Sequence, residues 1–203
     1  MGKRSNFDRV PRDYYPTPLE AVLPLLKHLP EDVLFAEPCA GDGRLITHIE
    51  THSSARAYLM TDIEPRIDYV GECDVFDLEI QGCDMAITNP PWNRNILHPL
   101  IVHLSNQVPT WLLFDADWIH TKQSADFGSR LTKIVSVGRV KWIEGSKHKG
   151  KDNACWYLFD KPDPEMISII RGPSYYNPFR HPERALARRN RILDTFLADG
   201  LIS

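Results

Sequence analysis

The sequence predicts an α/β fold with a mostly parallel sheet, helices on both faces and an antiparallel strand pair near the C-terminal end of the sheet. Short apolar runs alternate with helix-like segments between residues 33 and 115, a pattern typical of βαβ units. Farther along, a polar loop at 144–153 separates two apolar runs, as in a hairpin. With 203 residues and 42% hydrophobic content, the chain can bury one full-sized core. We therefore expect one main domain over 13–170, a flexible basic arm at 1–12 and an arginine-rich helical tail at 171–203.

Each element is expected from its own local pattern. Leucine and valine recur at helical spacing from Leu19 to Leu26, and Pro18 suits the start of this helix with Thr17 as its cap. Three more segments with helical patterns are Arg44–Thr51, Ile96–Asn106 and Pro182–Ala198. Apolar runs typical of parallel strands are Val33–Ala36, Ala55–Met60, Met85–Thr88 and Trp111–Phe114, and the hairpin strands are expected at Lys133–Ile143 and Ala154–Phe159.

The composition argues against several classes of protein. The cysteines never form a CxxC pair, so we expect neither a zinc knuckle nor a redox motif, and no metal site. The longest apolar runs are far shorter than a membrane span. We therefore expect a cytoplasmic protein without a membrane partner.

Charge is unevenly spread along the chain, although the net charge is only −3. Residues 31–90 hold 13 acidic and 3 basic side chains, which suits a cationic small ligand. Residues 121–151 hold 8 basic and 2 acidic side chains, and residues 171–203 hold 6 arginines against 3 acids. These two basic segments can face phosphates, and solvated surface charge is the alternative.

A glycine-rich string follows the first expected strand, with the sequence Glu37-Pro38-Cys39-Ala40-Gly41-Asp42-Gly43. Glycines between a strand and a helix let the backbone approach a ligand at the carboxyl edge of the sheet. The string lacks the third glycine of a dinucleotide fingerprint. Its acids, Glu37 and Asp42, suit an ammonium group better than a pyrophosphate. A plain structural turn is the alternative.

Two later acids stand where a nucleoside could use them. Asp62 ends the second expected strand, and a carboxylate there can accept both hydroxyls of a ribose. Asp74 can accept from an adenine amino group, and the apolar side chains beside it, Val75 and Phe76, could cover the adenine ring. A solvated acid at a strand end and an ordinary loop are the alternatives for these positions.

The most specific string is Thr88-Asn89-Pro90-Pro91-Trp92, directly after the third apolar run. Two consecutive prolines fix an extended exit from the strand and so aim the Asn89 side chain and the Pro90 carbonyl. These two acceptors can hold an amino group by both hydrogens and direct its nitrogen toward a methyl sulfonium. Trp92 offers a face for stacking the flat base that bears the amine. A simple Asn-Pro turn is the alternative.

The order of these motifs resembles the gamma group of S-adenosylmethionine-dependent DNA adenine methyltransferases, including small phage-encoded members. The similarity covers about residues 13–160 and implies a Rossmann-like class I methyltransferase fold with a seven-stranded sheet. It implies that Tyr15, Thr17 and Pro18 contact the methionine part of the cofactor, that Glu37, Cys39, Ala40, Gly41, Asp42 and Gly43 form the glycine motif, that Asp62 binds the ribose, and that Ile63, Asp74 and Val75 surround the adenine. It also implies that Asn89, Pro90, Pro91 and Trp92 are catalytic, with Asn89 in reach of the cofactor.

The chain departs from this family in two ways. Trp92 stands where Tyr or Phe is usual, and only about 40 residues follow the last expected strand, so we expect no large target-recognition domain. We therefore expect the segment 121–130, other loops and the tail to make the contacts with DNA. The basic side chains expected to hold DNA are Arg94, Lys147, His148, Lys149, Lys151 and Arg188.

The resemblance implies transfer of a methyl group from S-adenosylmethionine to the N6 amine of adenine in double-stranded DNA, by a monomer or a dimer. The target base would have to leave the helical stack. Protection of a phage genome from restriction is a role that the same resemblance suggests. An RNA or protein glutamine N-methyltransferase and a non-catalytic binder of cofactor or nucleic acid remain alternatives.

Overall fold

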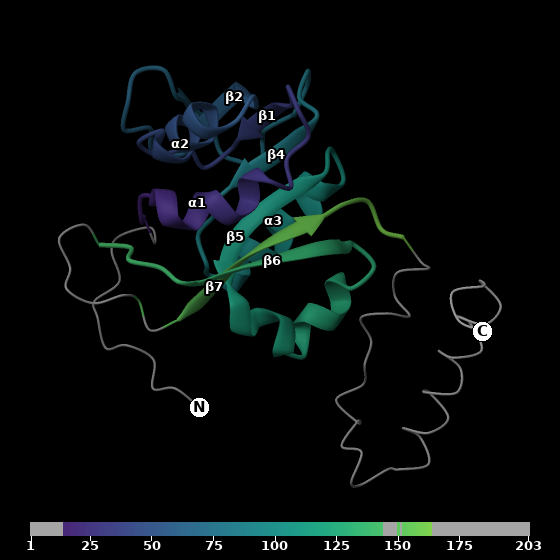
Figure 1. Ribbon diagram of the computed structural model, residues 1–203. Coiled ribbons are helices and arrows are strands. Elements are labelled where there is room, and N and C mark those ends of the chain that lie inside the picture. The colour runs from purple at the N-terminus through teal and green to yellow at the C-terminus, as the bar shows by residue number, and fades with distance from the viewer. Residues whose placement is uncertain (1–13, 144–149, 151, 164–203) are drawn as a thin grey trace, which may run out of the picture. The chain divides into compact units, whose positions relative to one another are not determined.

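The computed structural model of the protein describes residues 14–143, 150 and 152–163 (Figure 1). The chain divides into two compact units, Met1–Met166 and Ile167–Ser203. All elements below belong to the first unit, and the second unit lies outside the described residues. The expected tail helix therefore stays a prediction. Within the described part of the chain, no helix is long and apolar enough to cross a membrane.

One sheet of seven strands forms the centre of the first unit, in the order β3-β2-β1-β4-β5-β7-β6. In chain order the strands are β1 (Leu34–Glu37), β2 (Arg56–Asp62), β3 (Gly71–Glu72), β4 (Met85–Thr88), β5 (Thr110–Asp115), β6 (Leu131–Arg139) and β7 (Asn153–Phe159). The first five strands run parallel to one another. The last strand, β7, lies between β5 and β6 and runs antiparallel to both. The expected mostly parallel sheet with antiparallel C-terminal strands is confirmed.

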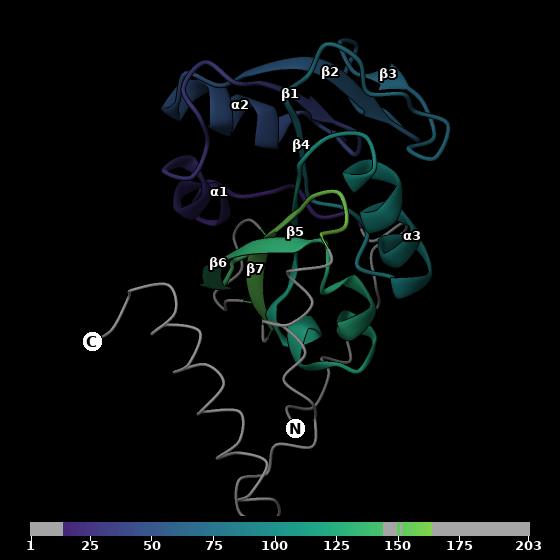
Figure 2. The same ribbon diagram turned by 90° about the vertical axis from the view of Figure 1, so that its right-hand side faces the viewer.

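Helices cover both faces of this sheet. In Figure 2, α1 (Leu19–Leu26) and α2 (Arg44–His52) lie on one side of the strands and α3 (Arg94–Ser105) on the other. The central strand β4 is buried along its whole length, because both of its faces are covered. Apolar side chains of α1 and α2 share one core with the strands, including Val22, Leu25, Leu45, Ile49, Phe35, Ile87 and Trp111.

Aromatic side chains fill the opposite face near the end of β5, where two short 3-10 helices follow, η2 (Ala116–His120) and η3 (Gln123–Phe127). Phe114 stacks on Tyr157 with ring centroids 4.3 Å apart, and Trp118 meets both rings edge-on. The Tyr157 hydroxyl donates to the carbonyl of Asp115 at 3.1 Å. The chain is therefore held firmly where it leaves β5.

One strand has no signal of its own in the sequence, and one expectation about local structure is wrong. The sequence shows no strand signal between β2 and β4, yet Gly71 and Glu72 form β3, a short edge strand whose residues are both exposed and so lack an apolar pattern. Thr17 does not cap α1. Pro18 occupies the N-cap position with extended backbone and no side-chain cap bond, while the Thr17 hydroxyl accepts a hydrogen bond from Asn89 instead.

Candidate active site

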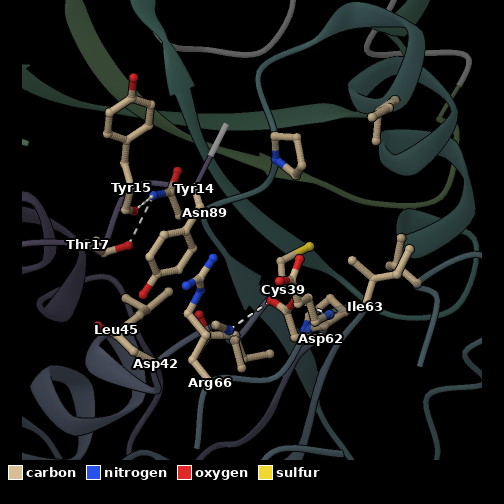
Figure 3. Close-up of a pocket in the computed structure, with 18 of the residues that line it drawn as sticks. Tyr14, Tyr15, Thr17, Cys39, Asp42, Leu45, Asp62, Ile63, Arg66 and Asn89 are labelled. Atoms are coloured by element: carbon tan, nitrogen blue, oxygen red, sulfur yellow. Dashed lines mark hydrogen bonds between the residues drawn. The ribbon is translucent and has the colours of Figure 1, made fainter. Parts of the chain in front are cut away.

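A cavity of about 720 Å³ opens at the carboxyl ends of β1, β2 and β4 (Figure 3). Its walls come from the segment before α1, the glycine turn after β1, the loops after β2 and β3, and the first turns of α3. Ligands of open α/β sheets bind at this edge. The volume falls within the range of cavities that bind small molecules.

The glycine turn forms one wall because two of its residues adopt left-handed backbone. Gly41 has φ 53° and Gly43 has φ 70°, and residues other than glycine rarely adopt such backbone angles. The Gly43 N–H closes the turn on the Ala40 carbonyl at 2.7 Å, and α2 starts directly after it. A Cβ atom on Gly41 would lie 2.7 Å from Cε2 of Tyr14. The backbone therefore comes closer to the cavity than any larger residue would allow.

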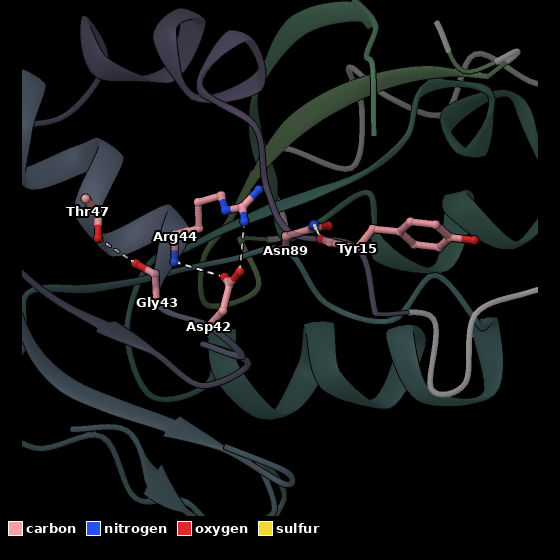
Figure 4. Close-up of polar contacts among 6 residues, drawn as sticks. All are labelled: Tyr15, Asp42, Gly43, Arg44, Thr47 and Asn89. Atoms are coloured by element: carbon pink, nitrogen blue, oxygen red, sulfur yellow. Dashed lines mark hydrogen bonds and ion pairs between the residues drawn. The ribbon is translucent and has the colours of Figure 1, made fainter. Parts of the chain in front are cut away.

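Asp42 is turned toward the start of α2. Its carboxylate accepts from the Arg44 N–H at 3.1 Å and pairs with the Arg44 guanidinium at 3.4 Å (Figure 4). The Thr47 hydroxyl donates to the Gly43 carbonyl at 3.1 Å in the same turn of helix. Asp42 lines the cavity, but its charge is partly offset by Arg44.

Glu37 ends β1 beneath the cavity and is only 2% exposed. Among the described residues, its Oε2 atom has no hydrogen-bond partner. Burial, together with the charges of Asp62 and Asp42, raises the pKa of the Glu37 carboxyl well above its ordinary value. A buried carboxyl without a partner is costly unless a ligand supplies one. A cationic ligand would satisfy this group.

Asp62 stands at the end of β2, as expected, and shapes the cavity with both carboxylate oxygens. Oδ2 accepts from the Gly41 N–H at 2.8 Å, and Oδ1 accepts from the Glu64 N–H at 2.8 Å. Each carboxylate oxygen has two lone pairs, so both can accept a further hydrogen bond. Ribose hydroxyls could use this remaining capacity.

An apolar slot continues the cavity beyond Asp62. Ile63 is 53% exposed there, and Val75 is buried. Asp74 lines the same region, and its Oδ1 atom accepts from the Phe76 N–H at 3.0 Å. Phe76, expected beside the adenine ring, lines the cavity as well, and so do two apolar side chains for which the sequence predicts no role in the site, Ile96 and Leu100. Ile96 and Leu100 lie four residues apart on α3, a helical spacing that signals a shared face but does not say that the face meets a cavity.

Tyr14 and Arg66 also line the cavity without having been expected. The Arg66 guanidinium lies 3.9 Å from the centroid of the Tyr14 ring. Burial, followed by the charge of Asp42 and a hydrogen bond to it, raises the pKa of the Tyr14 hydroxyl to about 12. Among the described residues, Arg66 is the one basic side chain in the cavity wall. No periodicity or motif marks these two residues, because they meet only in the folded chain.

Asn89 leaves β4 toward the cavity and is held in place by its neighbours. Its Nδ2 atom donates to the Tyr15 carbonyl at 3.2 Å and to the Thr17 hydroxyl at 3.1 Å (Figures 3 and 4). Its Oδ1 atom accepts from Nε1 of Trp92 at 3.4 Å. Asn89 and most of the residues expected to bind the cofactor line one cavity.

Trp92 does not line the cavity. Its Nε1 atom also donates to the Leu113 carbonyl at 3.1 Å, and its ring meets Trp142 edge-on at 5.6 Å between centroids. Its expected role of stacking a base stays a prediction. Pro90 also lies outside the cavity wall, whereas Pro91 is part of it.

Most of the residues expected to bind the cofactor share the cavity, namely Tyr15, Thr17, Glu37, Cys39, Ala40, Gly41, Asp42, Asp62, Ile63, Asp74, Val75 and Asn89. Two others do not line it. Gly43 lies at the N-cap of α2, where its left-handed backbone ends the turn, and Pro18 lines a separate groove. Among the residues expected to hold DNA, Arg94 starts α3 and donates to Gln123 at 3.3 Å. The others lie outside the described residues: Lys147, His148, Lys149, Lys151 and Arg188.

Cys39 lies in the glycine turn but is not suited to act as a nucleophile. Burial, followed by the charge of Asp62, raises the pKa of its thiol to about 12, and a protonated thiol is a weak nucleophile. Within the described part of the chain, no three His, Cys, Asp or Glu side chains gather as a metal site.

Similar solved structures include PH1948 of Pyrococcus horikoshii, a candidate RNA methyltransferase. Its TM-score is 0.52 at 16% sequence identity, with 79% of this chain and 90% of that chain covered. A dimethyladenosine transferase from Plasmodium falciparum is similar with a TM-score of 0.49 and 13% identity over 76% of this chain and 65% of that chain. Identities this low show the fold alone. The chain has the Rossmann-like fold of class I methyltransferases.

Sequence comparison adds no family. No protein-family model matches the chain. A stretch of 38 residues is 47% identical to penicillin-binding protein 1A of Aquifex aeolicus (strain VF5), covering 19% of this chain. The match spans only 5% of that protein's length, so it carries no statement about this chain's activity.

Proposed function

We propose that the protein transfers a methyl group from S-adenosylmethionine to the N6 amine of adenine in DNA. The observation that carries this proposal is the meeting of Asn89 with the acidic strand tips in one cavity. A cavity that held only the acids Glu37 and Asp62 could bind the cofactor but would say nothing about the acceptor of the methyl group. An amide held after β4 by an Asn-Pro-Pro turn adds a group that can hold an amine.

The cavity fits the cofactor by its chemistry. Glu37 offers a buried carboxyl whose Oε2 atom has no hydrogen-bond partner among the described residues, which suits the ammonium group of the methionine part. Asp62 has free acceptor capacity for ribose hydroxyls. Ile63 and Val75 offer apolar surface to the adenine ring beside the Asp74 carboxylate.

The acceptor amine would be held by Asn89 Oδ1 and the Pro90 carbonyl, each accepting one N–H. Pro90 lies outside the cavity wall but stands between two residues that are part of it, Asn89 and Pro91. This arrangement directs the nitrogen lone pair toward the cofactor, and such positioning supplies much of the rate acceleration. When bound, S-adenosylmethionine supplies the methyl group: a nitrogen–carbon bond forms as the carbon–sulfur bond breaks, the electron pair stays on sulfur, and the nitrogen loses one proton to solvent. The proposed reaction uses neither a metal ion nor a cysteine nucleophile.

Adenine in double-stranded DNA is favoured over other acceptors by two features of the sequence. The motif order resembles DNA adenine methyltransferases, and the basic segments at 121–151 and 171–203 suit phosphates. Cytoplasmic localisation, phage origin and a monomeric or dimeric state belong to the same proposal.

The test is incubation of the purified protein with radiolabelled S-adenosylmethionine and, in parallel, unmethylated DNA, total RNA and a protein extract. We expect N6-methyladenine in the DNA after nucleoside analysis. Asn89→Ala should reduce labelling to a small residual rate while the protein still binds cofactor, and Asn106→Ala, at the exposed end of α3, is the matched control. Label in RNA or protein would reassign the acceptor. Cofactor binding without any label would overturn the enzymatic function.

A further inference from the structure

The orientation of the Asn89 side-chain amide is dictated by the chemistry of its neighbours. A carbonyl oxygen can only accept a hydrogen bond, and an indole N–H can only donate one. The atom of Asn89 that faces the Tyr15 carbonyl must therefore be the nitrogen, and the atom that faces Trp92 Nε1 must be the oxygen. Tyr15, before α1, and Trp92, after β4, therefore require the same orientation of the amide.

The Thr17 hydroxyl strengthens this arrangement. It lies 3.1 Å from Asn89 Nδ2 and belongs to a residue that is only 5% exposed, so water competes little for the contact. With Tyr15 and Thr17 as acceptors, both hydrogens of the amide nitrogen are used (Figure 3). The nitrogen has no further hydrogen to offer to a ligand.

Trp92 is itself fixed and so acts as a rigid donor. Its N–H lies closer to the Leu113 carbonyl, at 3.1 Å, than to Asn89 Oδ1, at 3.4 Å. The edge-on contact with Trp142 restrains the ring from the side. The long contact uses only part of the acceptor capacity of Oδ1, which leaves a lone pair for a ligand.

We propose that Thr17 and Trp92 are positioning residues that lock the Asn89 amide with Oδ1 presented to the acceptor. This inference rests on the proposed function, because it gives Asn89 the task of holding an amine. Oδ1 can accept from a nitrogen that carries hydrogens and cannot bind a bare carbonyl. The lock thus selects acceptors that present an amino group to Asn89.

The first experiment separates this role from a merely structural one. Thr17→Val keeps the shape of the side chain and removes the acceptor, so the amide can rotate. We expect kcat for methyl transfer at saturating S-adenosylmethionine to fall about tenfold, as for the loss of one hydrogen bond. Thr17→Ser should restore most of the lost rate. Thr51→Val, which removes an exposed hydroxyl of α2, is the matched control.

Trp92→Phe keeps an aromatic ring and removes the donor, so it should also lower kcat. Asn89→Asp should lower it too, because a carboxylate cannot donate to the Tyr15 carbonyl. In an Asn89→Ala background, Thr17→Val should cause no further loss of rate, since the group that it positions is gone. Additive losses in that double variant would overturn the proposal.

A second readout needs no methylation at all. In an NMR spectrum, the side-chain NH2 signal of Asn89, assigned by its loss in Asn89→Ala, should exchange slowly with water in the parent protein. Thr17→Val and Trp92→Phe should both speed this exchange. Unchanged exchange together with unchanged kcat would overturn the lock. Faster exchange in a protein that methylates none of the acceptors would support the lock and overturn only the proposed function.

Discussion

Gly41 donates its backbone N–H to Oδ2 of Asp62 at 2.8 Å, so this side chain joins the turn after β1 to the end of β2, next to the backbone hydrogen bond from the Ala40 N–H to the Thr61 carbonyl at 2.9 Å. The second oxygen of Asp62 holds the Glu64 N–H in the loop that follows. The Asp62 carboxylate therefore holds two segments of the cavity wall, the glycine turn and the loop after β2, and still has lone pairs for a ligand. Changes at this residue should affect both the folded structure and cofactor binding.

Asp62→Asn should weaken cofactor binding about tenfold or more and lower the free energy of unfolding by about 1 kcal/mol. The shape of the side chain is kept, but its NH2 group must face one of the two backbone N–H donors. Isothermal titration calorimetry and thermal unfolding measure the two effects. Asp68→Asn, at an exposed position in the following loop, is the control. Cofactor affinity equal to that of the parent would contradict the ribose assignment.

Glu37→Gln should weaken cofactor binding about tenfold to a hundredfold, because a charged partner of the ammonium group is lost. The same change should stabilise the ligand-free protein at neutral pH, by about 1 kcal/mol or roughly 2–4 °C in Tm, because the buried group no longer ionises. Stability and binding should therefore move in opposite directions. A variant that loses both would show that Glu37 holds the fold rather than a cation.

The raised pKa of Glu37 should also make stability and binding depend on pH. The folded protein keeps the proton of this carboxyl at pH values where the unfolded chain, with an ordinary pKa of about 4.3, has released it. The free energy of unfolding should thus fall as pH rises from that ordinary value through the raised one. Cofactor binding should improve over the same range, because the cation favours the ionised carboxyl. The contribution of Glu37 to both slopes should be absent in Glu37→Gln, so both slopes should be shallower when thermal unfolding and calorimetry are repeated across pH.

Gly41→Ala should impair cofactor binding more than it impairs folding. The left-handed backbone costs an alanine about 1 kcal/mol, and its Cβ would displace the Tyr14 ring from the cavity wall. Gly71→Ala is a matched control, since a Cβ there meets only ordinary contacts at 3.7 Å or more. Equal cofactor affinities in the two variants would show that the close approach at Gly41 does not serve the ligand.

Arg66→Gln should weaken S-adenosylmethionine binding about tenfold, as for a lost hydrogen bond to a charged group. Among the described residues of the cavity wall, Arg66 is the one cation that could hold the carboxylate of the methionine part. Methylthioadenosine, which lacks that carboxylate, should bind parent and variant equally well. Arg56→Gln, at the opposite end of β2, is the control. Equal losses for both ligands would place Arg66 in a structural role.

Local patterns predicted the elements that carry strong signals. β4 and β5 are buried on both faces and appear in the sequence as unbroken apolar runs. The short edge strand β3 has no apolar residue, so no pattern could reveal it. The position of β7 between β5 and β6 could not be predicted from the sequence either, because strand order depends on which side chains pack together and not on periodicity.

The candidate site shows the same division. Glu37, Asp62 and Asn89 were expected because each follows a recognisable strand, and the carboxyl ends of parallel strands share one edge. Tyr14 and Arg66 come from segments without regular patterns, so only the folded chain places them at the cavity. The role of Thr17 was misjudged for a related reason. A threonine before a helix suits a cap, and the distant residue that competes for its hydroxyl cannot be read locally.

The position of β7 has a consequence for how the protein forms during synthesis. β7 follows the other strands along the described chain, yet it fills the gap between β5 and β6, and Nε1 of its Trp156 donates to the Ala21 carbonyl of α1 at 2.8 Å. The segment before α1 supplies the partners of Asn89. A nascent chain interrupted before Trp156 would contain every residue of the cavity but would lack the strand that completes the sheet between β5 and β6 and bonds to α1. Ribosome-bound intermediates should therefore acquire an ordered cavity only when this strand has emerged.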